Sequence, residues 1–318
     1  MHPQNETTGL LVMAYGTPHT LQDLRAYYTH IRHGREPSEA LQEQLQNRYF
    51  AIGGGSPLNR ITAEQAAQLT ADLSRRFPAQ DFRSYIGFKH TAPFIEEAVA
   101  RMHADGIHKG VALVMAPHYS AFSVRAYRER VTRAAAPLGW PRLVTVDAWY
   151  RQPKFIGYWA RCISVALQAL QPDDRRHAAV IFSAHSLPAR ILVESDPYVQ
   201  QVTESAQLIA AAAGLDTYAI GWQSAGRTPD PWIGPDVREV TRNLWNTRQQ
   251  RTFIYCPIGF VADHLEVLYD NDVECRAVVE ELGGAYVRPP MPNIHPLFIA
   301  ALADAVAEAL DRVASVPA

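Results

Sequence analysis

The sequence has few cysteines and no long apolar run. Its three cysteines are far apart and form no CxxC pair: Cys162, Cys256 and Cys275. This spacing argues against a disulfide framework and against a structural zinc site. No apolar run approaches the roughly 18 residues of a membrane-spanning helix, and the polar start MHPQNETTG lacks the features of a signal peptide. We therefore expect a soluble, cytoplasmic protein with no integral membrane segment.

A large excess of charge of either sign is also absent. The net charge is −2 over 318 residues, which gives no general attraction to nucleic acid or to anionic membranes. The glycines of Gly53–Gly55 are followed by Ser-Pro and not by Lys-Ser/Thr, so nucleotide binding at this loop is not expected. Apolar residues make up 47% of the chain, enough for the core of one large or two medium domains.

Short apolar runs alternate with helical patterns along the whole chain. Strands are expected at 10–14, 83–87, 111–116 and 143–148 in the first half, and at 178–183, 217–221, 252–256 and 285–287 in the second. Helices are expected at 61–77, 92–104, 155–170, 197–213, 236–245 and 296–313. Buried strands separated by helices predict the α/β class, with parallel four-stranded sheets flanked by helices.

The two halves repeat each other at the ends of their strands. Tyr85-Ile86-Gly87 corresponds to Ala219-Ile220-Gly221, and the segment 14–18 corresponds to 184–188. The repeat predicts two Rossmann-like domains, although a chance likeness of short strings is the alternative. We expect an N-terminal domain at 1–150, with a helical insertion at about 18–80, and a C-terminal domain at 151–318. The last helix could pack back on the first domain.

The segment from Tyr255 to Cys275 joins a strand end to a row of acidic residues. After the expected strand it breaks at Pro257, turns at Gly259 and then predicts a helix. Four carboxylates of this helix share a stripe roughly 80° wide and about 16 Å long: Asp263, Glu266, Asp270 and Glu274. A solvated acidic face is the alternative. However, like charges at i, i+4 repel unless they share a cation, and open α/β sheets place their sites beyond the carboxyl ends of strands.

Tyr15 and His185 are corresponding residues of the repeat. Each follows the first strand of its half, so two domains that face each other would place them on opposite walls of one cleft. Neutral imidazole and carboxylate suit iron or another divalent transition metal, and we expect His185 to keep an ordinary pKa near 6.5. A structural histidine is the alternative. His118, His264 and the other histidines are expected to be structural, and Trp222 is expected in the core.

Five strings of the sequence resemble the ferrochelatases, and most closely the monomeric coproporphyrin III ferrochelatases of Gram-positive bacteria. They are LLVMAYGTP, YIGFKHTAPFIEEAV, SAHSLP, WQSAGRTPDPWIGPDV and GFVADHLEVLYDNDVEC. The resemblance extends from about Gly9 to the final helix. It implies that two Rossmann-type domains enclose a porphyrin, and that this lyase of haem biosynthesis inserts ferrous iron into coproporphyrin III. It also implies a cytoplasmic monomer.

The resemblance implies roles for individual residues. His185 and Glu266 would handle the metal and accept the pyrrole protons, while Tyr15 would act from the opposite face of the porphyrin. An outer metal site would have three members: Arg48, Asp270 and Glu274. The residues that would bind the porphyrin and its carboxylates are Tyr15, Arg32, Arg48, Tyr49, Ser56 and Tyr127, with Lys89 and His90 at the other strand end. Trp232 is expected in the wall of the pocket because of its residue type, and packing in the core is the alternative.

No tightly bound cofactor is expected, because iron is a substrate, although the outer site could take a divalent cation such as Mg²⁺. The sequence has no cysteine-bearing C-terminal extension, so we expect no iron–sulfur cluster. Transient contact with other haem-pathway enzymes is expected. Three alternatives stay open: a protoporphyrin IX ferrochelatase, a cobalt or nickel tetrapyrrole chelatase, and a non-catalytic haem carrier. Tyr15, Arg32 and the absence of a membrane-contact segment favour coproporphyrin III.

Overall fold

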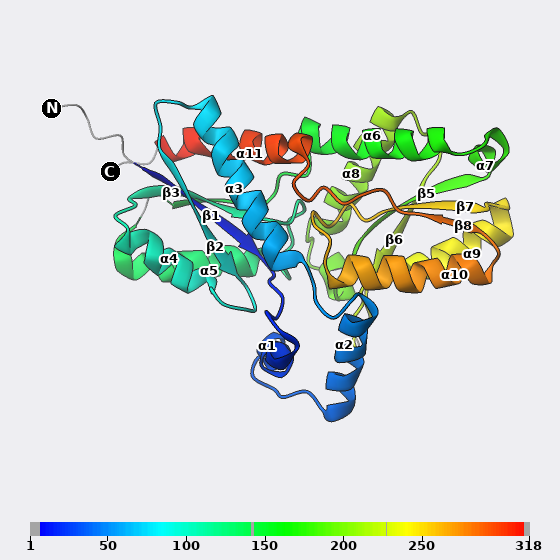
Figure 1. Ribbon diagram of the computed structural model, residues 1–318, viewed down its shortest axis with the longest axis horizontal. Coiled ribbons are helices and arrows are strands. Elements are labelled where there is room, and N and C mark those ends of the chain that lie inside the picture. The colour runs from blue at the N-terminus through cyan, green and yellow to red at the C-terminus, as the bar shows by residue number, and fades with distance from the viewer. Residues whose placement is uncertain (1–6, 141–142, 227, 315–318) are drawn as a thin grey trace. The chain divides into compact units, whose positions relative to one another are not determined.

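Strands and helices alternate along the chain in the computed structural model, which describes residues 7–140, 143–226 and 228–314 (Figure 1). The chain forms two compact units. The first comprises Met1–Gln152 and Asn293–Ala318, and the second comprises Pro153–Pro292. The polar start MHPQNETTG, for which no signal peptide is expected, includes residues 1–6. The string WQSAGRTPDPWIGPDV includes Arg227. Residues 1–6 and Arg227 lie outside the described residues.

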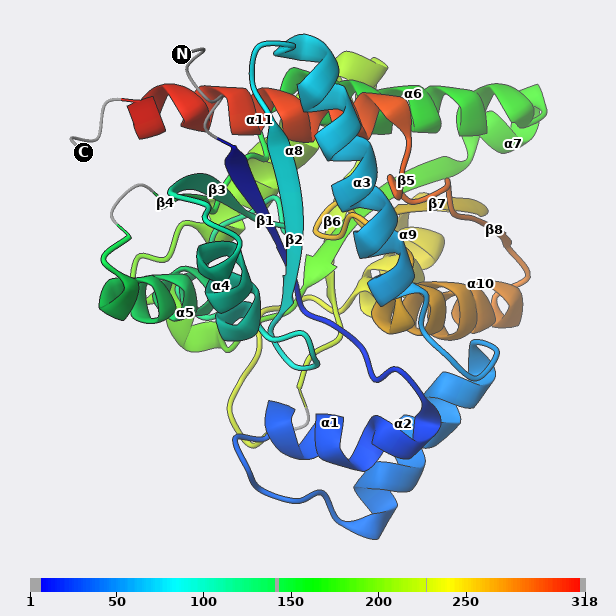
Figure 2. The same ribbon diagram turned by 60° about the vertical axis from the view of Figure 1, so that its left-hand side comes forward.

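The first unit contains a parallel sheet with strand order β2-β1-β3-β4. Its strands are β1 (Thr8–Ala14), β2 (Phe82–Phe88), β3 (Lys109–Val114) and β4 (Leu143–Val146). One face of the sheet is covered by α4 (Ile95–Ala104) and α5 (Arg125–Ala135), and the other by α3 (Leu58–Arg76) and α11 (Pro296–Ala314) (Figures 1 and 2). An ion pair of 2.6 Å between Arg76 and Asp304 joins α11 to α3.

The chain between β1 and α3 leaves the sheet and forms two further helices (Figure 2). They are α1 (Leu24–Ile31), which follows the 3₁₀ turn η1 (Leu21–Asp23), and α2 (Glu39–Ala51). The Ser38 side chain accepts a hydrogen bond from the backbone N–H of Leu41, which satisfies one of the free donors at the start of α2. Another 3₁₀ turn, η2 (Ala136–Leu138), follows α5.

The second unit repeats the topology of the first, with strand order β6-β5-β7-β8. Its strands are β5 (Ala178–His185), β6 (Ala219–Gln223), β7 (Thr252–Cys256) and β8 (Ala285–Val287). Its helices are α6 (Pro153–Ala169), α7 (Pro172–Arg176), α8 (Tyr198–Ala213), α9 (Val237–Arg248) and α10 (Arg276–Glu281), with the 3₁₀ turn η3 (Ala189–Leu192) after β5. Helices α6 and α8 lie on one side of the sheet, and α9 and α10 on the other (Figure 1).

The two four-stranded parallel sheets confirm the predicted fold class. Six of the eight strands differ from their expected ranges by one or two residues at one or both ends, and β6, for example, covers Ala219–Gln223 and not 217–221. Its parallel partner β5 continues to His185, and the register pairs Ile181 with Ala219 and His185 with Gln223. Strand β6 therefore extends as far as β5 offers backbone groups to pair with.

Two corresponding glycines explain part of the internal repeat. A Cβ added at Gly87 would lie 2.9 Å from the Cα of Ile95, and a Cβ at Gly221 would lie 2.8 Å from the Cα of Val237. Ile95 and Val237 are the first residues of α4 and α9. In each unit, therefore, the second strand carries a glycine where a helix begins against the sheet, as close helix–strand packing requires.

We expect Gly221→Ala to destabilise the protein by about 1–3 kcal/mol, because the new methyl group meets backbone atoms that cannot move without shifting α9. Gly157→Ala in α6 is the matched control. No heavy atom lies within 4 Å of a Cβ at that position, and alanine favours a helix over glycine by about 1 kcal/mol. Urea unfolding measures both changes. Equal stability of Gly221→Ala and the wild type would contradict this account of the repeat.

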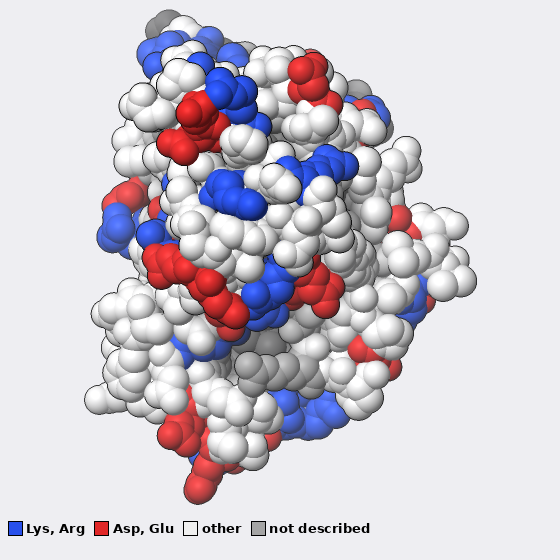
Figure 3. All heavy atoms as spheres, turned by 90° about the vertical axis from the view of Figure 1, so that its right-hand side faces the viewer, with Lys and Arg blue, Asp and Glu red and all other residues white. Residues whose placement is uncertain are grey.

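Three further expectations concern the core and the surface. Trp222 is buried, as predicted, and the three cysteines are free. Basic and acidic side chains are interspersed over the face in Figure 3 and do not form a patch of one sign. Within the described ranges, no helix is both long and apolar enough to cross a membrane.

Candidate active site

The imidazole of His185, at the end of β5, lies beside the carboxylate of Glu266. His185 is the last residue of this strand, and its Nε2 is 3.5 Å from Oε1 of Glu266. The other oxygen of the carboxylate, Oε2, is 3.2 Å from Nε2 of His264. Glu266 therefore lies between two imidazoles. The structure brings His185 and Glu266 together, as the sequence predicts.

Neighbouring groups fix the orientation of the His185 ring. Its Nδ1 donates to the backbone carbonyl of Ser186, which leaves Nε2 facing Glu266. The hydroxyl of Tyr198 donates to the backbone carbonyl of His185 at 2.9 Å and anchors the strand end. The Trp232 ring lies 6.5 Å from the His185 ring, centroid to centroid, so this sequence-predicted residue belongs to the same neighbourhood.

The charges of this pair depend on each other. Burial by itself would lower the pKa of His185, but the Glu266 carboxylate outweighs burial and the net effect is a raised pKa. Burial would raise the pKa of Glu266, but His185 and then His264 hold it well below its usual range. The expectation of an ordinary pKa for His185 is therefore wrong. The shift of each pKa favours an imidazolium beside a carboxylate, because each charge stabilises the other in a half-buried setting.

The helix that carries Glu266 is not a regular α-helix. Helical structure begins at Leu265, and η4 (Val267–Cys275) is a π-helix that continues into α10. The expected single stripe of four carboxylates is wrong in one member, because Asp263 precedes the helix and pairs with Arg288 at 3.2 Å. A π-helix has i→i+5 hydrogen bonds, so spacing rules for an α-helix do not describe its faces.

The two remaining acidic residues have partners within the second unit. Asp270 is 4% exposed and accepts a hydrogen bond from the hydroxyl of Ser224. Glu274 is 3.2 Å from Arg238, which also binds Asp236 at the start of α9. These contacts place the carboxylates on the side of η4 that meets the chain after β6 and the first turn of α9.

The first unit gathers a second group of sequence-predicted residues beyond β1 and β2. Tyr15 follows β1 and is 40% exposed, and its ring centroid lies 4.4 Å from that of His90. The ammonium of Lys89 lies 6.0 Å from the centroid of the Tyr15 ring and 5.2 Å from that of Tyr127. His90 Nδ1 is 3.0 Å from Nδ1 of His30. Tyr15, Lys89, His90 and Tyr127 thus form one cluster.

Burial changes the charges of this cluster. Burial, and then Arg130, lower the pKa of Lys89 to about 8. Burial, Lys89 and then His30 lower the pKa of His90 to about 3, so this imidazole is neutral at pH 7. Arg130 donates to the backbone carbonyl of Lys89 and to both oxygens of Glu96. The cluster therefore places the Lys89 amine, with a pKa of about 8, beside the exposed phenol of Tyr15.

The other predicted residues of the first unit are more scattered. Tyr49 is buried, and its hydroxyl is 2.8 Å from that of Thr17. Arg48 lies in the last turn of α2, and Arg32 lies just after α1 with its guanidinium 5.7 Å from the Tyr28 ring. The Ser56 hydroxyl accepts a hydrogen bond from the backbone of Leu58. The roles of these residues stay predictions.

Several residues of these clusters were missed by sequence reasoning. His264 was expected to be structural, but it contacts Glu266, and its position two residues earlier in the chain was the available signal. Ser224 and Arg238 are far from Asp270 and Glu274 in the sequence, and no local pattern connects them. His30 is 60 residues from His90 and reaches it only in the folded unit.

Asp270 and Glu274 are two members of the predicted outer metal site. In the part of the chain that the structure describes, no group of three or more His, Cys, Asp or Glu residues is placed to hold a metal ion. Asp270 accepts a hydrogen bond from Ser224, and Glu274 accepts one from Arg238. The outer metal site formed by these carboxylates and Arg48 stays a prediction.

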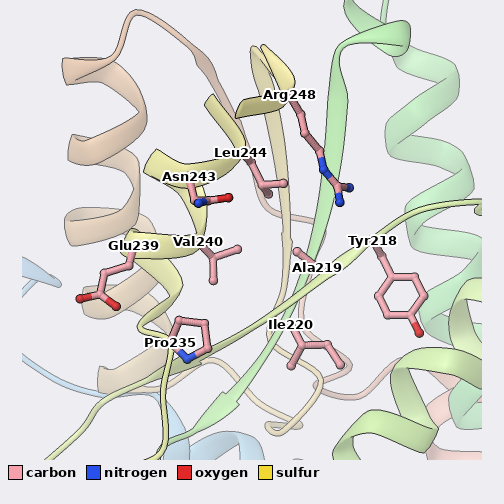
Figure 4. Close-up of a pocket in the computed structure, with 9 residues that line it drawn as sticks. All are labelled: Tyr218, Ala219, Ile220, Pro235, Glu239, Val240, Asn243, Leu244 and Arg248. Atoms are coloured by element: carbon pink, nitrogen blue, oxygen red, sulfur yellow. The ribbon is translucent and has the colours of Figure 1, made fainter. Parts of the chain in front are cut away.

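A surface cavity of about 370 Å³ lies elsewhere in the second unit (Figure 4). It is lined by residues of β6 and α9, among them Ile220, Leu244 and Arg248. None of the residues predicted to bind iron or porphyrin lines it. This cavity is separate from the His185–Glu266 pair.

His118 provides a test of how burial affects stability. It is 2% exposed, and burial lowers its pKa to about 3, whereas an unfolded histidine titrates near 6.5. Below about pH 6.5 this histidine binds a proton in the unfolded chain but not in the folded protein. The free energy of unfolding therefore falls by about 1.4 kcal/mol for each pH unit of acidification because of this residue. We expect His118→Gln to make the pH dependence of urea unfolding shallower by that amount. Exposed His108→Gln should leave the slope unchanged, and equal slopes for both variants would contradict the assignment.

A solved structure of another protein shares the fold of this chain. The chain resembles the structure of SirB from Bacillus subtilis with Fe³⁺, with a TM-score of 0.59 and 13% identity, over 97% of this chain and 98% of that one. At this identity the likeness shows a shared fold.

The sequence comparisons identify the family. A family model described as ferrochelatase matches residues 7–310, and the chain belongs to the ferrochelatase family. It is 54% identical over 305 residues to coproporphyrin III ferrochelatase 2 of Bacillus cereus, covering 96% of this chain and 95% of the relative. It is also 54% identical to coproporphyrin III ferrochelatase of Geobacillus kaustophilus, covering 95% of each chain. The protein is therefore an enzyme, a lyase of the porphyrin metal chelatase class.

Proposed function

We propose that this ferrochelatase inserts ferrous iron into coproporphyrin III and releases two protons. The observation that carries the proposal is the 54% identity, over nearly the whole of both chains, to the coproporphyrin III ferrochelatase 2 of Bacillus cereus. The His185–Glu266 pair supports it, because an imidazole and a carboxylate can bind a divalent metal and accept protons.

In the proposed reaction, Glu266 exchanges one cation for another. Its carboxylate raises the pKa of His185 and so favours the protonated imidazole. Arrival of Fe²⁺ provides a new positive charge next to Glu266, which removes the stabilisation of the imidazolium and lets His185 lose its proton. Neutral Nε2 can then bind the iron or take a proton from a pyrrole N–H. Asp270 and Glu274 lie further along the same helix and add negative charge that favours the approach of a cation.

The first unit contributes groups that suit a large anionic ring. We propose that Tyr15 and Tyr127 contact the porphyrin and that Arg32, Arg48 and Lys89 bind its carboxylates, since guanidinium groups can bind carboxylates with two hydrogen bonds. The proposed roles of the other predicted binding residues are of the same kind: Tyr49, Ser56, His90 and Trp232. Remote contacts of this kind can supply the energy that distorts a flat ring so that a metal can enter it.

The proposal includes no tightly bound cofactor and no iron–sulfur cluster. Asp270 and Glu274 are carboxylates of the kind that hold a divalent cation such as Mg²⁺, and no step is assigned to such an ion. We further propose that the enzyme works as a monomer in the cytoplasm, with iron and coproporphyrin III as its substrates and with transient contacts to other haem-pathway enzymes.

An anaerobic absorbance assay with ferrous iron tests the proposal. Coproporphyrin III and protoporphyrin IX are supplied side by side, and conversion to the iron porphyrin is followed for each. We expect turnover with coproporphyrin III and a higher kcat/KM than with protoporphyrin IX. A clear preference for protoporphyrin IX would overturn the substrate assignment, and binding without consumption of metal-free porphyrin would indicate a carrier.

A further inference from the structure

A buried arginine contacts both the loop before the Glu266 helix and the middle of that helix. Arg288 directly follows β8, and its side chain is 12% exposed. Its Nε and Nη2 each lie 2.7 Å from one oxygen of Asp272, which is a two-bond contact between the guanidinium and the carboxylate. Nη2 is also 3.2 Å from Oδ1 of Asp263. The hydroxyl of Tyr286 donates to Asp272 at 2.8 Å and completes the cluster.

The two carboxylates flank the residues of the candidate site. Asp263 precedes the helix and Asp272 lies within η4, so His264 and Glu266 fall between them in the chain. One guanidinium therefore fixes the distance between the two ends of this segment. A π-helix is rare and occurs mostly as single turns within α-helices. Contacts at the two ends of this nine-residue segment therefore bear on the side chains between them.

Contacts to other elements hold the same segment. Gln223 and Asn271 exchange two amide hydrogen bonds of 3.2 Å, and Gln223 also donates to the backbone carbonyl of Glu266 at 3.4 Å. Ser224 donates to Asp270. Three consecutive side chains, at positions 270 to 272, are thus bound by β6, by the residue that follows it and by Arg288. Arg288 is the member of this set that also binds the loop before the helix.

We infer that Arg288 is a positioning residue, which holds the segment 263–272 in its π-helical form and so fixes Glu266 beside His185. This inference rests on the proposed function, since it assigns to Arg288 the placement of the metal-handling carboxylate. Arginine suits the role because its planar group can bind Asp272 with two parallel bonds and reach Asp263 with the same nitrogen. A lysine has one charged atom and cannot keep all three contacts.

Two conservative variants test the inference without removing a whole side chain. Arg288→Lys retains the charge but loses the planar guanidinium, and Asp263→Asn keeps the shape of the side chain but removes the charge that faces Arg288. We expect kcat/KM for Fe²⁺ to fall about 10-fold in Arg288→Lys and several-fold in Asp263→Asn, as for other residues that orient metal ligands. The Kd of coproporphyrin III, measured by fluorescence quenching, should stay within about two-fold of the wild type, because Arg288 acts on the metal-handling side chains. Arg288→Met should have a larger effect than Arg288→Lys.

Hydrogen–deuterium exchange supplies a readout that does not depend on turnover. Both variants should speed exchange in the peptide covering 263–275 while other peptides keep wild-type protection. Arg242→Met is the matched control, because it breaks an exposed 2.9 Å pair with Glu281 at the end of α10 and should change neither measurement.

The outcomes separate this inference from the proposed function. Wild-type turnover of coproporphyrin III tests the function, whereas local exchange in the variants tests the positioning role whichever porphyrin is preferred. Unchanged iron dependence in Arg288→Lys and Asp263→Asn would overturn the inference. So would equal losses of iron and porphyrin binding accompanied by faster exchange throughout the second unit, since that pattern indicates general destabilisation. If Arg288→Met does not fold, the measurements on Arg288→Lys and Asp263→Asn still test the positioning role of Arg288.

Discussion

Replacing His185 with alanine is expected to reduce the kcat of iron insertion by about 10²–10⁴-fold, the range over which a positioned acid–base group contributes to a rate. The imidazole is the partner of Glu266 and the group at the end of β5 that can both bind a metal and take a proton. Its removal also leaves the Glu266 carboxylate without one of its two imidazole neighbours. Anaerobic single-turnover absorbance measurements determine the rate directly.

His177→Ala is the matched control for this variant. His177 immediately precedes β5, at the opposite end of the strand from His185, and it is exposed. It should retain wild-type kcat. Binding of coproporphyrin III by His185→Ala should remain measurable, because one side chain is a small part of the surface that a porphyrin contacts. A His185→Ala protein with more than half of the wild-type kcat would remove His185 from the reaction.

Glu266→Gln is expected to lower kcat/KM for iron by about 100-fold, because the amide keeps the shape of the side chain but loses the charge that attracts the metal. The variant should also change the pH profile. In the wild type, Glu266 raises the pKa of His185, so His185 stays protonated to a higher pH and activity rises with pH as this proton is lost. In Glu266→Gln burial remains without the carboxylate, so the pKa of His185 falls. The rise in activity should therefore move to lower pH.

The pH profile of kcat/KM for Fe²⁺ measures this shift. Glu280→Gln on α10 is a suitable control, since it removes an exposed carboxylate from the same helical segment and should leave the profile in place. A shift of the Glu266→Gln profile toward higher pH would show that Glu266 does not govern the charge of His185. An unchanged iron dependence would remove Glu266 from metal handling.

The structure also explains why Glu266 remains ionised despite its burial. A buried carboxylate by itself favours its protonated form, but His185 and His264 approach its two oxygens from different positions. His264 therefore also lowers the pKa of Glu266 and favours its ionised form. This second imidazole gives Glu266 a partner even when His185 has lost its proton.

Much of the fold could be predicted because it depends on local patterns. Apolar runs between helical segments predict parallel strands, and the repeated glycines at positions 87 and 221 mark equivalent strand–helix contacts in the two halves. The sequence also indicated that His185 ends one strand and that Glu266 lies on the acidic helix after another. The structure brings these two side chains together because the carboxyl end of β5 and the start of the helix after β7 lie at the same edge of one sheet.

Other features could not be predicted from spacing. The rule of i, i+4 neighbours placed Asp263 on the carboxylate stripe, but this residue precedes the helix and binds Arg288. The prediction failed because a regular α-helix was assumed, whereas contacts from Gln223, Ser224 and Arg288 accompany a π-helix. The contact of His264 with Glu266 depends on the turn that precedes the helix.

The sequence by itself determined the α/β class, the repeated order of the strands, the membership of the ferrochelatase family and the identity of the two central side chains. These features follow from periodicity, from glycine positions and from motifs that are contiguous in the chain. The tertiary structure alone decided the π-helix, the three-way contact of Arg288 and the raised pKa of His185. Each of these depends on charges and hydrogen bonds between residues that are distant in the sequence or buried together, and such interactions exist only once the chain has folded.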